Sequence, residues 1–487
     1  MEHSKLSEHN FEKGIFKSEM SELLTPLTKE EDWVHAKSVE YMWLALILYQ
    51  GERTTHLEKC MNILRKMSDS IDEKHIETPS LTNILLFSKE NQEIFTLILK
   101  EEDVLNSLAP ISLVLDDLSL FKKELRAYQF TVEERLDKLN LVLEELSDHQ
   151  SQLSTDIRYL LLYQYIMRGK ILFNDSQKEI MDGLKDYPYL NIENERMRFI
   201  RPTIRSMEIG ISQTFGRNNS FSKSFWKSIG QYTECEIFSI KINENKADLT
   251  FIKNKLYKVL KYYQDILQNV RQIDEKLFVL VCILTYSYKR LLELVEHDMQ
   301  QTISGRSIIR SCIENYMMTK YLLKNEDKHE NVWEEFQYYG IGNYKLIFER
   351  YREGAPNLGN THVNFDYLNI LVSEYINKEF IEMDTKYFGR GNIRKKFEEV
   401  NEESLYKYFY EYDSQYEHGL WGAIRESSVL KCNAPGHQYH GIPDVDNIQN
   451  LPDVGYDAID ILEKHLAILI SIYPLPFGIQ DEEANIE

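Results

Sequence analysis

The scarcity of glycine and proline is the feature that most constrains how this chain can fold. Its 487 residues include 20 Gly and 11 Pro, and residues 253–303 contain neither. Apolar side chains recur in this stretch every three or four residues, which is the period of an amphipathic helix. They include Leu256, Val259, Leu260, Tyr263, Ile266, Leu267 and Val270. Alternation with a period of two is rare, and residues 236–244 are the only plausible strand. The sequence therefore predicts an all-α fold.

Length and local polarity predict how the helices are divided. At roughly 100–200 residues per domain, a chain of 487 residues holds more than one domain. The polar stretch 243–248 is the best boundary. We predict an N-terminal helical domain at 1–245, a C-terminal helical domain with the candidate site at 246–478, and an acidic tail at 479–487. The expected architecture is a multi-helix bundle in two packed helical halves.

Charge and cysteine usage narrow the class of protein. Lys and Arg total 57 and Asp and Glu total 78, so the net charge is −21. This balance argues against a general nucleic-acid coat or a membrane-surface binder, but it allows RNA contact through a local basic site. The five cysteines are scattered and favour a reducing cytoplasm. The longest apolar runs, 41–49 and 277–286, are about half as long as a membrane span. We expect no membrane association.

The first candidate site is a stripe of charged residues at helical spacing. Arg306, Arg310 and Glu314 are four residues apart and share a helix face. Such a stripe can hold a phosphate through a bidentate guanidinium. The alternative is a network of salt bridges between helices.

The second candidate is a serine and a histidine one helical turn apart. Ser414 and His418 share a face just before Gly419. A histidine there can serve as a general acid or base, because its pKa is near neutrality. A serine nucleophile activated by the histidine is conceivable, although the sequence offers no GxSxG elbow. The alternative is a contact between the two that ends the helix.

The third candidate is a compact group of metal-ligand residues. Cys432, His437 and His440 follow a Cys-x4-His-x2-His pattern in a loop constrained by Pro and Gly. Zinc takes four such ligands, and His418 is a candidate for the fourth. Two alternatives remain open: hydrogen bonds that tie the loop to the core, or participation in an active site with His418. No other cofactor is expected.

Several motifs are missing from the sequence. It contains no GxxxxGK[ST], no GxGxxG after a strand, no HExxH and no EF-hand loop. Nucleotide-driven motors, dinucleotide oxidoreductases and zincin proteases are therefore disfavoured.

With these residues in hand, the C-terminal half resembles a widespread, all-helical bacterial family of unknown function. The resemblance rests on the apolar helix 277–297, Gly305 with Arg306, Arg310 and Glu314, residues 392–394, and Tyr408 with Ser414, His418 and Gly419. It covers roughly 250–475 well, and 30–110 loosely.

The arrangement also resembles the HEPN superfamily. Its members are often toxin or antiviral ribonucleases and usually form dimers with the site at the interface. The resemblance implies that His418 is the acid/base, that Arg306 or Arg310 binds phosphate, and that Glu314 orients an arginine. Ser414 stands where an arginine is expected upstream of the histidine.

We expect one of two functions, and a third is less favoured. The first is a cytosolic, metal-independent ribonuclease of an antiphage-defence or toxin system, acting as a homodimer. The second is a non-catalytic helical scaffold or sensor that binds a protein partner. The third is a metal-dependent hydrolase built on Cys432, His437 and His440.

Overall fold

The computed structural model is mostly helical, which confirms the predicted fold class. It describes residues 6–18, 33–71, 78–115, 120–126, 128–174, 177–212, 220–238, 245–270, 274–354, 359, 361–375, 381–383, 388–389, 391–447 and 449–476. The predicted acidic tail lies outside these residues. Among the helices described, none has the length and apolar character needed to cross a membrane.

The chain divides into two compact units. Unit 1 comprises residues 1–238 and 430–442, and unit 2 comprises residues 239–429 and 443–487. The chain first passes from unit 1 to unit 2 after residue 238, close to the boundary predicted at 245. The sequence-based division keeps residues 430–442 with the C-terminal half, whereas strand pairing places them in unit 1. We call residues 430–442 the return segment.

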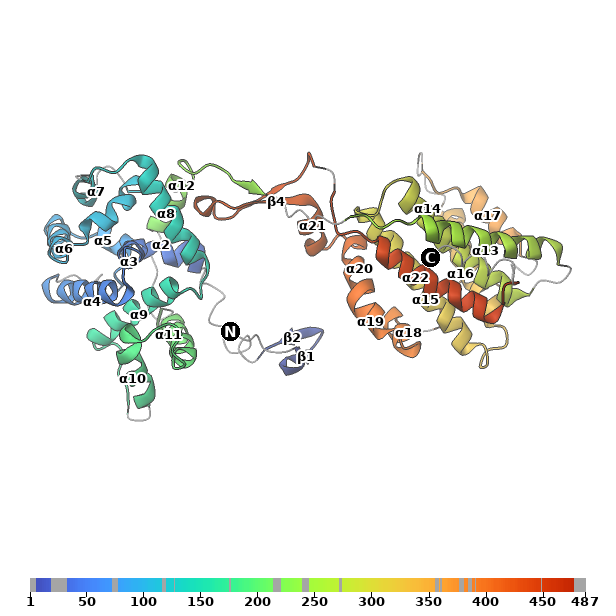
Figure 1. Cartoon of the computed structure of the whole chain (residues 1–487), viewed down its shortest axis with the longest axis horizontal. Helices are drawn as coiled ribbons and strands as arrows, with labels where there is room; N and C mark the ends of the chain where they lie inside the picture. The colour runs from blue at the N-terminus through green and yellow to red at the C-terminus, as the bar shows by residue number, and fades with distance from the viewer. Residues whose placement is uncertain are drawn as a thin grey trace. The chain divides into compact units, whose positions relative to one another are not determined.

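Unit 1 packs around a short helix that is buried on all sides. Every side chain of α3 (Met42–Leu48) is buried, and the Trp43 indole donates to the carbonyl oxygen of Pro79 and meets Phe95 edge-on. The surrounding helices, which Figure 1 shows in blue to green, are η2 (Trp33–Lys37), α2 (Ser38–Glu40), α4 (Arg53–Ser70), α5 (Leu81–Leu85), α6 (Lys89–Glu101), η4 (Leu105–Leu113), α7 (Leu120–Leu125), α8 (Val132–Ser147), α9 (Gln152–Met167), α10 (Lys178–Asp186), η6 (Tyr187–Tyr189), α11 (Met197–Ser212) and α12 (Ser220–Ile229).

Local sequence signals set the helix starts of unit 1. Thr131 and Glu134 form a capping box at α8, in which each side chain accepts a hydrogen bond from the other residue's backbone N–H. Ser151 caps α9 in a similar way by accepting from the N–H of Ser154. Such caps satisfy backbone donors that a helix start leaves unpaired.

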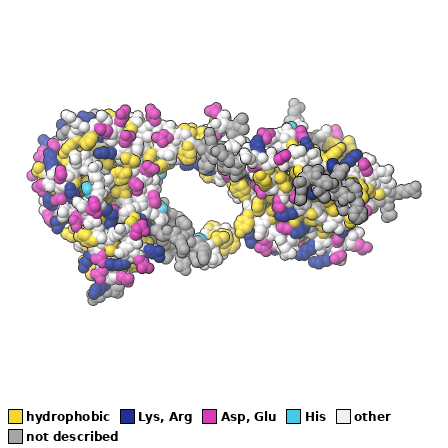
Figure 2. Space-filling view, in the orientation of Figure 1, with side chains coloured by type: hydrophobic (Ala, Val, Ile, Leu, Met, Phe, Trp, Pro, Cys, Tyr) yellow, Lys and Arg dark blue, Asp and Glu magenta, His cyan; other side chains and the backbone are white. Residues whose placement is uncertain are grey.

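Unit 2 packs around α15 (Ile303–Asn325), which lies against α14, α20 and α22. Its N-cap is Thr302, whose hydroxyl accepts from the N–H of Gly305. The other helices are α13 (Thr250–Asn269), α14 (Glu275–Glu296), α16 (Val332–Gly354), α17 (Phe365–Ser373), α18 (Ile393–Glu399), α19 (Glu403–Leu405), η8 (Tyr406–Tyr410), α20 (Glu411–Glu417), α21 (Trp421–Ser428) and α22 (Gly455–Ile472). On the visible face of each unit, acidic and basic side chains are interspersed (Figure 2).

Strands are few and short among the described residues. Near the N-terminus, η1 (Leu6–Glu8) precedes the hairpin of β1 (Asn10–Glu12) and β2 (Ile15–Lys17). A second sheet has the order β3 (Ile237–Phe238), β4 (Val429–Cys432), β5 (Gly441–Pro443). β3 lies in the stretch predicted as a strand, and it runs antiparallel to β4 with Ile237 opposite Cys432.

Candidate metal centre and the predicted site on α15

The return segment is held in unit 1 by backbone hydrogen bonds. The N–H of Cys432 donates to the carbonyl oxygen of His440 at 2.9 Å, which closes the loop between β4 and β5. The N–H of Asn433 donates to the carbonyl oxygen of Glu236 at 2.8 Å, which joins the loop to the segment before β3. Within this loop, η9 (Pro435–His437) packs against α8 and α12.

The loop has a tightly specified backbone. Gly436 lies so close to Thr233 that an added Cβ would stand 2.2 Å from its Oγ1, so a larger residue there would require the Thr233 side chain to move. Gln438 and Tyr439 have φ angles of 57° and 49°. This left-handed conformation costs roughly 1–2 kcal/mol for each residue other than glycine. The two strained residues separate His437 from His440, whose ring centres lie 5.3 Å apart.

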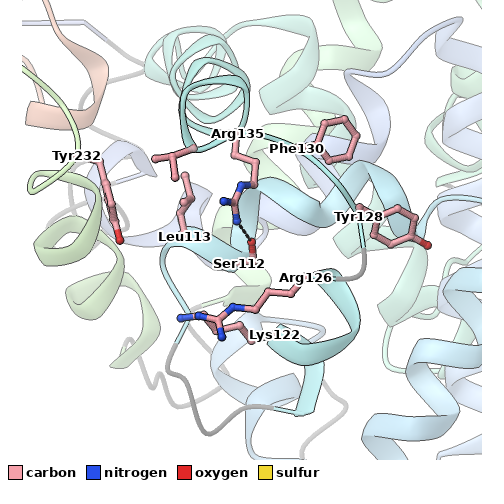
Figure 3. A pocket seen from close by; sticks show the side chains of 9 residues that line it. Ser112, Leu113, Lys122, Arg126, Tyr128, Phe130, Arg135 and Tyr232 are labelled. Atoms are coloured by element: carbon pink, nitrogen blue, oxygen red, sulfur yellow. Dashed lines mark hydrogen bonds between the residues drawn. The ribbon is translucent and has the colours of Figure 1, made fainter.

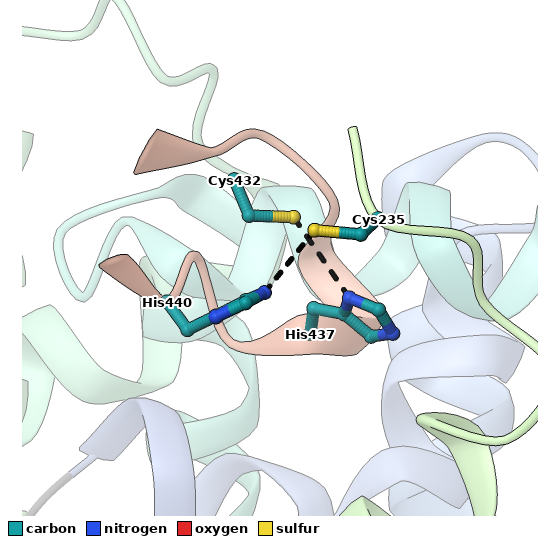
Figure 4. Close-up of side chains that lie close together, drawn as sticks. All are labelled: Cys235, Cys432, His437 and His440. Atoms are coloured by element: carbon teal, nitrogen blue, oxygen red, sulfur yellow. Dashed lines mark hydrogen bonds between the residues drawn. The ribbon is translucent and has the colours of Figure 1, made fainter. Parts of the chain in front are cut away.

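Four side chains meet beside this loop, and we call them the Cys/His cluster: Cys235, Cys432, His437 and His440 (Figure 4). Their ligand atoms all lie within 4.8 Å of one another. Cys235 Sγ is 3.3 Å from His440 Nε2, and Cys432 Sγ is 3.9 Å from His437 Nδ1. In a tetrahedral zinc site, the ordinary Zn–S and Zn–N lengths place sulfur and nitrogen about 3.5 Å apart. These two sulfur–nitrogen spacings lie within about 0.4 Å of that length.

Neighbouring groups orient the cluster. The His437 Nε2 faces the carbonyl oxygen of Gly230 at 3.3 Å, and donation of its proton there leaves the Nδ1 lone pair for a metal. The N–H of Ala434 donates to Cys432 Sγ at 3.4 Å. Cys432 is buried, whereas Cys235 and His440 are exposed. One side of the cluster is thus fixed by the core, and the other is open to solvent.

The donor set suits zinc best. Two thiolates and two imidazoles in tetrahedral array are typical of Zn²⁺, and four protein ligands leave no open position for a substrate. An ion held by all four residues would therefore be structural and not catalytic.

The predicted metal group is brought together, but its fourth member differs from the expectation. Cys432, His437 and His440 converge as the spacing suggested. Cys235 completes the group, where the sequence pointed to His418, which lies in unit 2. A sequence signal for Cys235 existed, since it immediately precedes the only predicted strand. Nothing in the sequence identified the partner of that strand.

The stripe on α15 forms a closed set of contacts, the Arg310 network (Arg310, Glu314, Tyr410 and Ser414). The Arg310 Nε donates to Ser414 Oγ at 3.1 Å, and its Nη2 donates to Tyr410 Oη at 2.6 Å. Its Nη1 lies 3.6 Å from Glu314 Oε2, which also accepts from Tyr410 Oη. The guanidinium lies 4.6 Å from the centre of the Tyr410 ring. The network thereby fastens η8 and α20 to α15.

Arg306 lies apart from this network and inside the unit. Only 3% of the residue is exposed, and its Nη2 donates to the carbonyl oxygen of Pro452. Its guanidinium is 5.9 Å and 5.8 Å from the ring centres of Tyr412 and Tyr416. The two arginines of the predicted stripe thus have different surroundings.

Asp413 is an unexpected titratable group beside the predicted stripe. Burial raises its pKa to about 7, with a further increase from Asp457, while Arg306 and Arg310 act in the opposite direction. Burial also raises the pKa of Tyr410, assisted by Glu314. The sequence did not indicate Asp413, because its raised pKa results from burial, and a single sequence does not reveal burial.

His418 is exposed at the end of α20, where it forms the C-cap. Its N–H donates to the carbonyl oxygen of Ser414, and Gly419 follows with φ of 56°. The N–H of Leu420 reaches back to the carbonyl oxygen of Gln415, which completes a Schellman ending. Ser414 itself donates to the carbonyl oxygen of Tyr410. Ser414 and His418 are thus linked through the backbone at the helix end.

Part of the chain matches a known protein family. Residues 277–437 match a family of unknown function, DUF5677. The matched region runs from α14 to η9, so it contains the Arg310 network, Cys432 and His437, but neither Cys235 nor His440. Searches of the curated proteins and of the solved structures found no significant match.

Proposed function

We propose that this chain is a zinc-binding helical protein in which a structural Cys2His2 site fastens the return segment to unit 1. The observation that carries the proposal is the convergence of four ligand atoms within 4.8 Å. A reducing compartment would keep both thiols available as ligands. All five cysteines lie in the described part of the chain and none forms a disulfide.

The role of the ion follows from what it would connect. Cys235 and His440 are 205 positions apart, and the chain between them makes up most of unit 2. Among the described residues, the backbone joins the two segments through the two-residue pairing of β3 with β4 and the hydrogen bond from Asn433 to Glu236. A metal bound by both segments would oppose their separation, because apparent binding free energies of structural zinc are about 10–16 kcal/mol in peptides at neutral pH.

Zinc content of purified variants tests this proposal. Wild type and Cys282→Ser, which removes an exposed cysteine of unit 2, should each carry one zinc per chain. Cys235→Ser and His440→Asn should lose most of it, and both alter exposed side chains. Elemental analysis after gel filtration gives the stoichiometry. Full zinc in Cys235→Ser, or none in wild type refolded with zinc, would contradict the proposal.

A second candidate is the ribonuclease of a toxin or antiphage-defence system. The observation that favours it is that Arg310, Glu314 and Ser414 lie together on α15 and α20, with His418 at the end of α20. In this proposal His418 transfers the proton and Arg310 stabilises the phosphate charge. A homodimer would place two such sites together, as the HEPN resemblance implies.

Expression toxicity separates the second candidate from a non-catalytic scaffold that binds a protein partner. Wild type should arrest growth and degrade RNA, and His418→Ala should do neither. His362→Ala alters an exposed histidine of unit 2 and is the matched control. Equal growth of all three strains with intact total RNA would favour the scaffold.

A further inference from the structure

Unit 1 contains a cavity that the zinc proposal does not involve. It has a volume of about 450 Å³ and lies where the end of η4, the end of α7 and the start of α8 meet, with Tyr232 at one side (Figure 3). This volume is within the range of small-molecule sites, which is about 300–1,000 Å³. It is large enough for one mononucleotide and too small for a folded partner.

The lining of the cavity has a charge opposite to that of the whole chain. Among the described residues that line it, Lys122, Arg126 and Arg135 are cationic and none is acidic, whereas the chain carries a net charge of −21. Lys122 is 8% exposed and donates to the carbonyl oxygen of Leu115 at 2.7 Å. Figure 3 shows the Lys122 and Arg126 side chains next to each other. Both have further partners, so a ligand would add to existing contacts.

Arg135 is held in place from two directions. Its Nε donates to the carbonyl oxygen of Thr131, and its Nη1 donates to Ser112 Oγ at 2.8 Å. Ser112 in turn donates to the carbonyl oxygen of Ala109. A guanidinium fixed in this way loses little conformational entropy when it binds an anion, and its planar fork matches phosphate geometry.

Aromatic side chains flank these cations. Tyr128, Phe130 and Tyr232 belong to the lining, and Tyr232 is 45% exposed. Aromatic faces stack on planar bases, while arginines and lysines bind phosphate. From this combination we propose that the cavity binds a nucleoside monophosphate, with the phosphate on Lys122, Arg126 and Arg135 and the base on Tyr232.

Calorimetric titration of the full-length chain at physiological ionic strength, where exposed charges are screened, tests this assignment. AMP and UMP should bind at one site per chain, and both should bind more tightly than ribose 5-phosphate or inorganic phosphate. Adenosine, which lacks the phosphate, should not bind detectably. Arg126→Gln should weaken AMP binding by about tenfold or more, as expected for the loss of a charge-assisted contact.

The matched control is Lys123→Gln, which removes the same charge from an exposed position of α7 outside the lining. It should change AMP affinity by less than about twofold, because exposed charges at a distance are screened. Tyr232→Ala should weaken AMP more than inorganic phosphate. The proposal is overturned if no nucleotide binds, if ribose 5-phosphate binds as well as AMP, or if Arg126→Gln and Lys123→Gln behave alike.

Discussion

The Cys/His cluster of unit 1 and the Arg310 network of unit 2 both join segments that are distant in sequence. They differ in what their polar atoms contact. In the Cys/His cluster, two sulfurs and two ring nitrogens lie within 4.8 Å of one another. In the Arg310 network, Nε, Nη1 and Nη2 of the guanidinium each face an oxygen of the protein. The cluster therefore has ligand atoms gathered for an ion, whereas Arg310 already bonds three side chains of its own unit.

Removal of zinc should have the largest effect on stability. Zinc in 1,000-fold excess over its Kd stabilises the folded form by about 4 kcal/mol, so chelation should destabilise unit 1 by a similar amount. Hydrogen exchange gives the local readout, because the amides of Cys432 and Asn433 bond to His440 and Glu236. Their protection should fall on chelation while that of α15 stays unchanged. Equal protection with and without chelator would show that the backbone alone holds the return segment.

The second largest expected effect is a dependence of the stability of unit 2 on pH. Burial raises the pKa of Asp413 from 3.8 to about 7, so the folded state binds a proton that the unfolded state has lost. The resulting stability is full below pH 4 and is lost as the pH rises towards 7. Three pKa units correspond to about 4 kcal/mol, and relaxation of the site makes about 2–4 kcal/mol the expected change.

Asp413→Asn tests this dependence because the amide stays neutral. Denaturant unfolding between pH 4 and 8 should show a flatter profile for Asp413→Asn than for wild type, with the variant more stable at pH 8. Asp366→Asn, at an exposed position of α17, is the control and should leave the profile unchanged. A wild-type slope retained in Asp413→Asn would assign the dependence to another group.

Arg310→Met should have the next largest effect. The change removes the partner of Ser414, Tyr410 and Glu314, and unfolding of unit 2 should become easier by about 1–3 kcal/mol. Arg394→Met removes an exposed pair with Glu398 on α18 and should cost less than about 0.5 kcal/mol. If the two variants lose equally little, the Arg310 guanidinium is not structural. The ribonuclease candidate would then gain support.

The sequence predicted the fold class and named three of the four residues of the Cys/His cluster, for identifiable reasons. Helical periodicity and the lack of Gly and Pro are local signals, and so is the Cys-x4-His-x2-His spacing. Cys235 was missed because it joins the group through strand pairing across about 200 residues, and pairing partners leave no local trace. Asp413 was missed because its pKa depends on burial. The α15 stripe was identified, but only the contacts show that its arginines bind protein oxygens.

The smallest expected effect tests whether backbone shape prepares the Cys/His cluster. Gln438 has a φ of 57°, a conformation that glycine adopts without a steric penalty. Gln438→Gly should therefore stabilise the zinc-bound form of the return segment by about 0.5–1 kcal/mol. Asn433→Gly, in the same loop but with ordinary backbone angles, should instead destabilise it by a similar amount, because glycine gains freedom in the unfolded chain. Competition with a chromogenic chelator measures both. If Gln438→Gly weakens zinc binding, then the side chain of Gln438, and not its backbone angle, supports the loop.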